Sequence, residues 1–114
     1  MKRGAVVLAV LPFTDLTDQK RRPALVVSPE NLAGDDVLVA FVTSSKGAPL
    51  EPTDLLIRAD DPDFKETGLK RPSVVKLAKL FAIHKGLLLG RLGHFSPRLM
   101  AEVDARLRLA LGLP

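Results

Sequence analysis

The feature that most constrains this sequence is a series of short, valine-rich apolar runs, each bounded by turn-forming residues. The first run extends from Ala5 to Leu11 and ends at Pro12, which lacks the backbone N–H that a continuing strand needs. Apolar runs of this length favour β-strands, and short links between them favour antiparallel pairing. Further strands are expected at residues 24–28, 37–43, 55–57, 73–76 and 87–92.

The segments between these runs are rich in proline, glycine and charged residues, which is typical of exposed connections. Long loops are expected at residues 12–23 and 44–54, and a turn or a single helical turn at residues 77–80. The acidic residues between Asp60 and Glu66 predict a solvated loop, because their spacing does not match a calcium-binding loop.

The C-terminal segment carries the signals of an amphipathic helix. Ser96 suits its N-terminal cap, Pro97 its first position and Gly112 its end. One face of this helix is apolar and consists of Leu99, Met100, Val103, Leu107, Ala110 and Leu111. The whole sequence therefore predicts a mainly β fold in which residues 1–114 form a single domain. We expect a small, strongly bent β-sheet or barrel closed by a C-terminal α-helix.

The composition narrows the classes of function. The chain has no cysteine, which excludes disulfides, a thiolate nucleophile and cysteine-ligated metal sites. Seventeen Lys and Arg residues against thirteen Asp and Glu give a net charge of +4, which favours an anionic partner such as nucleic acid or an acidic polypeptide. Because the aromatic residues are five phenylalanines, contacts to phosphates and hydroxyls are expected to outweigh base stacking.

The N-terminus needs separate attention, because Lys2 and Arg3 followed by an apolar run imitate a secretory signal. No small-residue cleavage site follows, and charged residues come next, so a buried first strand is the preferred interpretation. No run reaches the roughly 18 apolar residues that a membrane-spanning helix requires. A cytoplasmic protein without a membrane partner is therefore expected.

Basic and hydroxyl side chains are expected to meet at the ends of two neighbouring strands. Arg22 precedes Pro23 at the start of the second strand, so its guanidinium is held on a rigid backbone and can bind a phosphate with little loss of entropy. Thr43, followed by Ser44 and Ser45, ends the third strand. If the two strands are antiparallel neighbours, Arg22 and Thr43 converge on one phosphate.

Other catalytic motifs are not found in the sequence. His84 and His94 are the only histidines, and their spacing gives no metal-binding or acid–base motif, so each is interpreted as a turn or rim residue. The sequence also lacks a phosphate-binding glycine loop, a nucleophile elbow and a zinc-protease helix. No metal and no cofactor are expected.

Several short motifs, taken in order, resemble those of the MazF/PemK toxins. They are Arg3-Gly4, then Pro12, Phe13, Thr14 and Asp15, then residues 21–28, then Val42, Thr43 and Ser44, then Gly68, Leu69 and Lys70, then residues 72–76, and finally residues 90–93 followed by Ser96. Their common order and spacing make the resemblance specific, and they cover nearly the whole chain.

The resemblance implies an SH3-like barrel that forms a homodimer and cuts single-stranded RNA, as the toxin of a toxin–antitoxin pair and a sequence-selective mRNA interferase. By this resemblance, Arg22 corresponds to the family's catalytic arginine and Thr43 to its threonine. The resemblance also implies that no metal is required. The 2′-hydroxyl of the RNA would attack the adjacent phosphorus and leave a cyclic phosphate and a free 5′-hydroxyl. A cognate antitoxin with an acidic, partly disordered tail is expected to occupy the RNA groove.

Two departures from the family pattern concern the proton acceptor and the first strand. Several relatives carry a glutamate shortly before the arginine, whereas residues 17–20 of this chain read TDQK. Asp18 or Asp15 is therefore the candidate proton acceptor, and Asp18 completes the predicted catalytic set. Ala5 stands where many relatives have aspartate.

The remaining candidates for RNA contacts lie on the two long loops and the fifth strand. They are Phe13, Thr14, Asp15, Lys20, Arg21, Ser44, Ser45, Lys46 and Lys76. Phe13 either stacks on a base or plugs the end of the barrel, and Lys46, Lys76 and Lys79 are either phosphate contacts or plain surface. Leu109, outside the apolar face of the helix, is a candidate for the dimer contact.

Two other functions stay open. A non-enzymatic toxin of the same fold would act on DNA gyrase, as CcdB-like proteins do, and would not need Arg22 beside Thr43. A degenerate relative would bind only RNA or the antitoxin.

Overall fold

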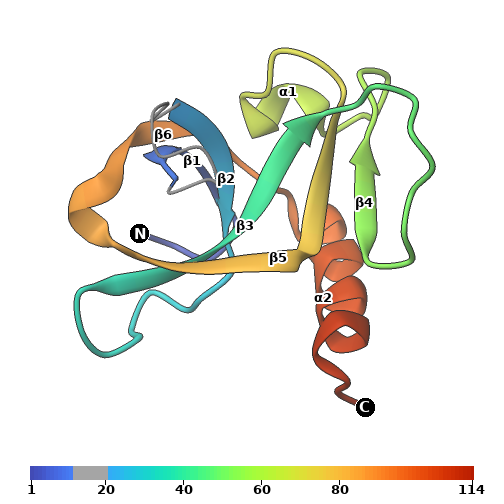
Figure 1. Cartoon of the computed structure of the whole chain (residues 1–114). Coiled ribbons are helices and arrows are strands. Elements are labelled where there is room, and N and C mark those ends of the chain that lie inside the picture. The colour runs from blue at the N-terminus through green and yellow to red at the C-terminus, as the bar shows by residue number, and fades with distance from the viewer. Residues whose placement is uncertain (12–20) are drawn as a thin grey trace.

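The computed structural model describes residues 1–11 and 21–114. Its main feature is an antiparallel sheet of six strands in the order β4-β5-β3-β2-β1-β6 (Figure 1). The strands are β1 (Ala5–Val10), β2 (Arg21–Val26), β3 (Asp36–Ser44), β4 (Asp54–Ile57), β5 (Ser73–His84) and β6 (Leu88–His94). The described helices are α1 (Phe64–Thr67), the 3-10 helix η1 (Lys85–Leu87) and α2 (Pro97–Leu111). The mainly β fold with a C-terminal helix is thus confirmed.

The start of β2 differs from the prediction. Residues 21–23 were expected in a loop, but they begin the strand and pair with β1, so that Arg22 lies opposite Ala9. Pro23 is tolerated because it lies near the start of the strand, where the pairing of β2 with β3 has not yet begun; that pairing starts at Ala24. Arg22 is therefore placed by a strand and not by a loop.

The fifth strand also differs from the prediction. Residues 77–80 were expected as a turn, whereas β5 is continuous from Ser73 to His84. The pairing with β3 nevertheless shifts here, because Ala40 pairs with Leu80 and the next residue, Phe41, pairs with Lys76. Figure 1 shows β5 turning sharply along its length. The predicted turn is a bend within a strand, since Leu77 points inward and is fully buried.

The two faces of the bent sheet form two hydrophobic clusters. The first contains Val6, Leu25, Ala40, Val42, Leu55, Ile57, Val75 and Leu77, and α2 covers it with Leu99 and Val103. The second contains Ala5, Val7, Ala9, Ala24, Val26, Val37, Val39 and Ile83. Ala5, where many relatives carry aspartate, is 2% exposed and belongs to this second cluster.

The C-terminal helix begins and ends as predicted. The Ser96 hydroxyl accepts a hydrogen bond from the Leu99 N–H at 3.2 Å, and Pro97 occupies the first turn. Gly112 ends the helix in the left-handed conformation. The prediction was wrong for the last residue of the apolar face, because Leu111 is 56% exposed.

A close approach of backbones joins α1 to β6. Gly68 has a φ of +72°, and a Cβ on this residue would overlap the carbonyl oxygen of Leu92. A Cβ on Gly93 would in turn overlap the backbone of Glu66 and Thr67. Both positions therefore require glycine, and this contact fixes the chain just before β5.

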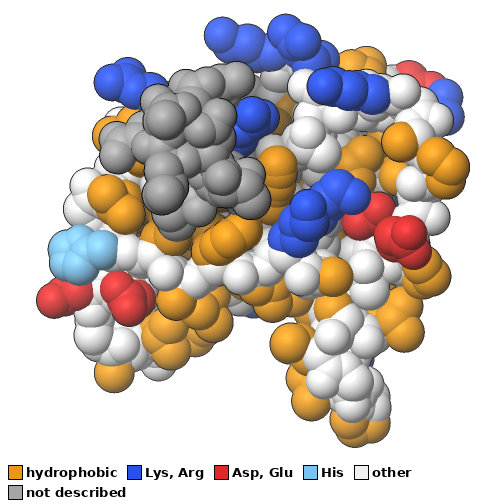
Figure 2. Space-filling view, in the orientation of Figure 1, with side chains coloured by type: hydrophobic (Ala, Val, Ile, Leu, Met, Phe, Trp, Pro, Cys, Tyr) orange, Lys and Arg blue, Asp and Glu red, His pale blue; other side chains and the backbone are white. Residues whose placement is uncertain are grey.

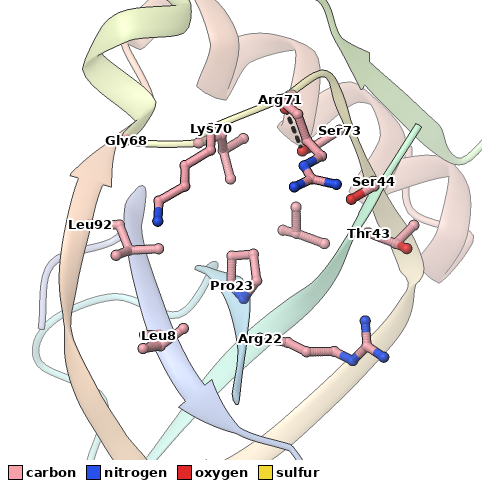
Figure 3. A pocket seen from close by; sticks show the side chains of 12 residues that line it. Leu8, Arg22, Pro23, Thr43, Ser44, Gly68, Lys70, Arg71, Ser73 and Leu92 are labelled. Carbon is pink, nitrogen blue, oxygen red and sulfur yellow. Dashed lines mark hydrogen bonds between the residues drawn. The ribbon is translucent and has the colours of Figure 1, made fainter. Parts of the chain in front are cut away.

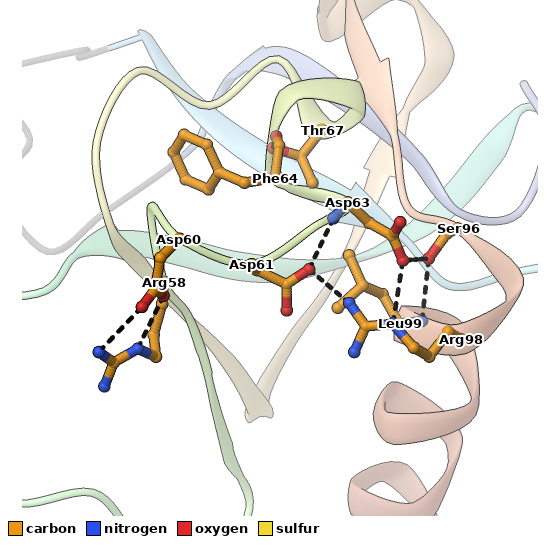
Figure 4. A network of polar contacts seen from close by, with 9 residues as sticks. All are labelled: Arg58, Asp60, Asp61, Asp63, Phe64, Thr67, Ser96, Arg98 and Leu99. Atoms are coloured by element: carbon orange, nitrogen blue, oxygen red, sulfur yellow. Dashed lines mark hydrogen bonds and ion pairs between the residues drawn. The ribbon is translucent and has the colours of Figure 1, made fainter.

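The acidic segment is more ordered than predicted (Figure 4). The carboxylate of Asp63 accepts hydrogen bonds from the Ser96 hydroxyl at 2.7 Å and the Arg98 Nε at 3.0 Å, and Asp61 also pairs with Arg98. Asp60 pairs with the Nε of Arg58 at 2.9 Å. The prediction of a purely solvated loop was wrong, because two carboxylates tie this segment to the start of α2.

Candidate functional site

A cavity of about 320 Å³ lies where β2 begins and β3 ends (Figure 3). Its walls come from five strands of the sheet, namely β1, β2, β3, β5 and β6, and from the segment between α1 and β5. The lining residues are Leu8, Arg22, Pro23, Val42, Thr43, Ser44, Gly68, Leu69, Lys70, Arg71, Ser73 and Leu92. The described lining contains three cations and no acidic residue, so the cavity favours an anion.

Arg22 and Thr43 lie on the same cavity, as the sequence predicted. The pairing of β2 with β3 runs from Val26 opposite Val39 to Ala24 opposite Phe41. The same register, continued by two residues, sets Arg22 against Thr43, and directly opposed side chains share one face of an antiparallel pair. Figure 3 shows both side chains on the same side of the strands, whereas Pro23 points toward the middle of the cavity.

A second cavity, of about 190 Å³, continues from the first across the end of β3. Thr43 and Ser44 line both cavities. The second cavity is also lined by Ser45, Lys46 and Lys76, which were all predicted as RNA contacts. The structure therefore brings five predicted site residues together beyond Arg22.

Among the cations that line the two cavities, Lys76 is the one with a carboxylate partner in the described part of the chain. Its Nζ lies 3.3 Å from the carboxylate of Asp54, whose side chain is only 4% exposed. Asp54 also accepts a hydrogen bond from the Glu51 N–H at 3.0 Å. Much of the positive charge of Lys76 is therefore neutralised within the protein.

Two site residues were missed by the sequence analysis. Lys70 and Arg71 line the first cavity opposite Pro23, and both are exposed. Both residues lie in the segment between α1 and β5, and the local sequence does not indicate which part of the sheet this segment crosses. The close contact of Gly68 with β6 fixes the path of the segment. In the sequence analysis, Lys70 appeared only as part of the family resemblance.

Several predicted residues lie away from the cavities or outside the described residues. Arg21 is exposed at the start of β2 and lines neither cavity, and the Lys79 ammonium lies 5.7 Å from the centre of the Phe41 ring. Residues 12–20 are not described, so the predictions for Phe13, Thr14, Asp15, Asp18 and Lys20 lie outside the described part of the chain.

The two histidines lie at opposite ends of β6 and its preceding turn. His84 accepts a hydrogen bond from the Gly86 N–H at 2.9 Å, which confirms a turn role. His94 is exposed and lies 3.6 Å from the carboxylate of Glu66. Within residues 1–11 and 21–114, no group of three or more His, Cys, Asp or Glu side chains is arranged to hold a metal ion.

Positive side chains gather around this region of the surface. Figure 2 shows Lys and Arg side chains along the upper side of the view, where β2, α1 and the start of β5 lie in Figure 1.

Among the described residues, none of the helices has the length and apolar character needed to cross a membrane.

Comparison with known proteins gives the family. The sequence model of the family described as "PemK-like, MazF-like toxin of type II toxin-antitoxin system" matches residues 2–111. The chain belongs to this family. The match covers nearly the whole sequence, so it agrees with the resemblance seen in the motifs. No curated protein sequence matches this MazF-like toxin.

Solved structures share the fold of the toxin. An endoribonuclease in complex with its cognate antitoxin, from Mycobacterial species, is 25% identical with a TM-score of 0.78, and the match covers 100% of this chain and 97% of that chain. An endoribonuclease from Mycobacterial species is 26% identical with a TM-score of 0.73, and the match covers 100% and 93%. The Mycobacterium tuberculosis toxin MazF-mt6 is 21% identical with a TM-score of 0.75, over 96% and 98%.

Proposed function

We propose that this MazF-like toxin is a metal-independent, sequence-selective endoribonuclease that cleaves single-stranded RNA, that is, an mRNA interferase. The observation that carries the proposal is the position of Arg22 and Thr43 on one cavity without acidic residues in its described lining. Solved structures of similar fold at 25% and 26% identity are endoribonucleases, which supports the same reaction class.

The proposed step is a transesterification within the RNA. The 2′-oxygen attacks the adjacent phosphorus, the bond from phosphorus to the 5′-oxygen breaks, and a 2′,3′-cyclic phosphate and a 5′-hydroxyl result. The proton of the 2′-hydroxyl passes to a base, and the leaving 5′-oxygen takes up a proton. Arg22 neutralises the charge that grows on the phosphorane oxygens, and the Thr43 hydroxyl donates a hydrogen bond to the same group.

Arg22 is not the proposed base, because an arginine stays protonated. The proposal assigns the base role to Asp18, with Asp15 as the alternative, as the sequence suggested. Ser44, Ser45 and Lys46 would contact the RNA backbone beyond the reacting group, along the second cavity.

The partners follow from the same cavity and the family. We propose a homodimer whose single-stranded RNA groove is blocked by the acidic, partly disordered tail of a cognate antitoxin. A solved structure of similar fold contains an endoribonuclease with its cognate antitoxin, which supports this partner class. The single domain of residues 1–114, the SH3-like barrel and a cytoplasmic location belong to the same proposal.

The test is cleavage of a mixed-sequence, single-stranded RNA by purified protein in EDTA, followed by mapping of both new ends. We expect cleavage without metal and products with 5′-hydroxyl groups. Arg22→Ala should lower kcat by about 100- to 1,000-fold, the usual cost of losing one group that stabilises an oxyanion. Arg108→Ala, which removes an exposed arginine of α2 that lines neither cavity, serves as the matched control and should cut RNA normally.

Thr43 is tested with a conservative pair. Thr43→Val removes the hydroxyl while keeping the shape, and Thr43→Ser keeps the hydroxyl, so only the valine variant should lose activity. Cleavage that requires magnesium, or that continues unchanged in Arg22→Ala, would show that the proposed mechanism is wrong. Intact RNA together with trapped DNA breaks would instead indicate a gyrase poison, and RNA binding without cleavage a degenerate relative.

A further inference from the structure

The connection between α1 and β5 places two further cations on the active-site cavity. Lys70 and Arg71 are both exposed at the backbone turn that precedes β5, and both line the first cavity. Figure 3 shows Lys70 reaching toward Leu92 and Arg71 reaching toward Ser44, so the two side chains point into the same hollow from one wall.

Neither cation is neutralised by the described residues. Lys76, on the second cavity, is paired with Asp54, but no carboxylate in the described part of the chain lies within ion-pair distance of Lys70 or Arg71. The nearby acidic residues Asp61 and Asp63 are already held by Arg98. Within residues 1–11 and 21–114, the wall of the cavity formed by Lys70 and Arg71 therefore presents positive charge that no carboxylate pairs with.

The segment that carries these cations is fixed at both ends. On one side, Leu69 is buried and its N–H donates to the Thr67 hydroxyl at 3.1 Å. On the other side, the Ser73 hydroxyl donates to the Arg71 carbonyl at 2.9 Å, and the Ser45 N–H donates to the Pro72 carbonyl at 2.9 Å. A backbone held in this way loses little entropy when its side chains bind a ligand.

The middle of the cavity is apolar. Leu8, Pro23 and Leu92 line the hollow, and in Figure 3 Pro23 lies between Lys70 and Arg71 on one side and Arg22, whose side chain extends away from the middle, on the other. A volume of about 320 Å³ lies near the lower limit of small-ligand sites, which is the scale of a single nucleotide. Across the cavity, the cations Lys70 and Arg71 are followed by an apolar wall and then by the cation Arg22. This order matches a phosphate, a base and a second phosphate of a nucleic-acid strand.

We propose that this cavity is a nucleotide subsite next to the cleaved bond. Lys70 and Arg71 bind the phosphate that neighbours the scissile phosphate, and the base between the two phosphates lies against Leu8, Pro23 and Leu92. Arg22 and Thr43 hold the scissile phosphate itself. The inference deepens the proposed nuclease function and rests on it, because it adds positioning residues to the same reaction.

The phosphate contacts are tested by binding at several salt concentrations. The probe is a fluorescein-labelled, mixed-sequence, single-stranded DNA oligonucleotide, which lacks the attacking hydroxyl and cannot be cut. Lys70→Ala/Arg71→Ala should weaken binding by about tenfold or more, the lower range for charge-assisted hydrogen bonds. The slope of log K against log salt should become shallower by about 0.7, since Lys70 and Arg71 bind one phosphate and each lost single-strand phosphate contact contributes about 0.7.

The matched control is Lys65→Ala/Arg108→Ala, which removes the same charge from exposed positions that do not line the cavity. It should keep the slope of the wild-type protein. In RNA cleavage, the double variant at 70 and 71 should raise KM, and kcat should fall far less than in Arg22→Ala. Circular dichroism checks that all variants are folded.

The base contact is tested with RNA in which single positions beside the mapped cleavage site lack their base. Leu92 is 42% exposed, so Leu92→Ala leaves the core intact. At one neighbouring position, removal of the base should lower kcat/KM by several-fold for the wild-type protein and by much less for Leu92→Ala. If the effects of base removal and of Leu92→Ala on kcat/KM multiply at every position, the two changes act independently and the proposed base contact is refuted.

The outcomes separate this inference from the proposed function. If Arg22-dependent cleavage occurs but the double variant at 70 and 71 binds the probe with wild-type affinity and slope, the subsite is refuted and the nuclease stands. If the wild-type protein binds the probe through Lys70 and Arg71 but cuts no RNA, the phosphate contacts hold and the nuclease assignment is wrong. Loss of affinity for a poly-glutamate peptide alone would assign the cations to a polypeptide and overturn the subsite.

Discussion

The contact between α1 and β6 should make Gly68 one of the least replaceable residues of the toxin. Gly68→Ala introduces two unfavourable features at once. The residue has a φ of +72°, and the new Cβ would overlap the carbonyl oxygen of Leu92. Neither the new Cβ nor the carbonyl oxygen belongs to a flexible side chain, so α1 and β6 must move apart to make room.

The two costs can be separated with another glycine of the same chain. Gly47 has a φ of +73° but no heavy atom within 4 Å of the position that its Cβ would occupy. Gly47→Ala therefore reports the conformational cost alone, about 1–2 kcal/mol. Replacement of glycine by alanine also stabilises a protein by restricting its unfolded chain. This gain in stability is common to both variants and cancels when they are compared. Gly68→Ala should cost about 1–3 kcal/mol more than Gly47→Ala, the usual range for forced overpacking.

Urea denaturation followed by circular dichroism measures the free energy of unfolding of both variants. At about 4 °C per kcal/mol for a chain of this size, the extra cost should also lower Tm by about 4–12 °C relative to Gly47→Ala. Gly93→Ala adds the overlap with Glu66 and Thr67 without a positive φ, so relative to the wild-type protein it should reproduce the difference between the two variants less the gain of about 0.4–1 kcal/mol from a stiffer unfolded chain. Equal stabilities of Gly68→Ala and Gly47→Ala, within about 0.5 kcal/mol, would refute the close approach.

Three further predictions concern the helix and its acidic partner. Ser96→Ala should lower the free energy of unfolding by about 0.5–2 kcal/mol in urea denaturation, because the cap of α2 is lost. Leu99→Ala, at 2% exposure, should cost about 2–5 kcal/mol, whereas Leu109→Ala, at 58% exposure, should change stability by less than about 0.5 kcal/mol. Hydrogen bonds from Ser96 and from Arg98 hold the pKa of Asp63 below its ordinary value of 3.8, so its stabilising effect is complete above that pH and is lost as the pH falls through the lowered pKa. Asp63→Asn should therefore be less stable than the wild-type protein at pH 7, and in urea titrations this difference should shrink as the pH falls below 3.8 through the lowered pKa; an unchanged difference over that range would contradict the ion pair.

The strands were predictable because a strand that is buried on both faces of a sheet has a continuous apolar sequence, which can be seen locally. The valine-rich run that becomes β1 and the cap of α2 at Ser96 are set by residues close in sequence. The bend of β5 was assigned to a turn because a strand that changes face breaks its own alternation. Only the pairing of Lys76 with Phe41 and of Leu80 with Ala40, each more than 30 residues away, shows that residues 76–80 belong to one strand.

The candidate site was predictable where it follows from strand pairing. Arg22 and Thr43 come together because β2 and β3 are consecutive antiparallel neighbours, which short-range patterns indicate. Lys70 and Arg71 were missed because their position depends on packing between α1 and β6. Likewise, the acidic residues Asp61 and Asp63 were assigned to solvent, since their partner Arg98 lies more than 30 residues further along the chain.

Thr43 and Ser44 form a wall that two hollows share. A substitution at this wall alters both cavities at once, whereas a substitution at Leu92 or at Lys46 alters only one. For a toxin that cuts RNA as proposed, variation that changes which RNA sequence is cut is therefore expected to accumulate on the outer walls, one side at a time. The shared wall would stay constant in such lineages. Laboratory selection for altered cleavage specificity should likewise change the outer walls and leave Thr43 and Ser44 unchanged.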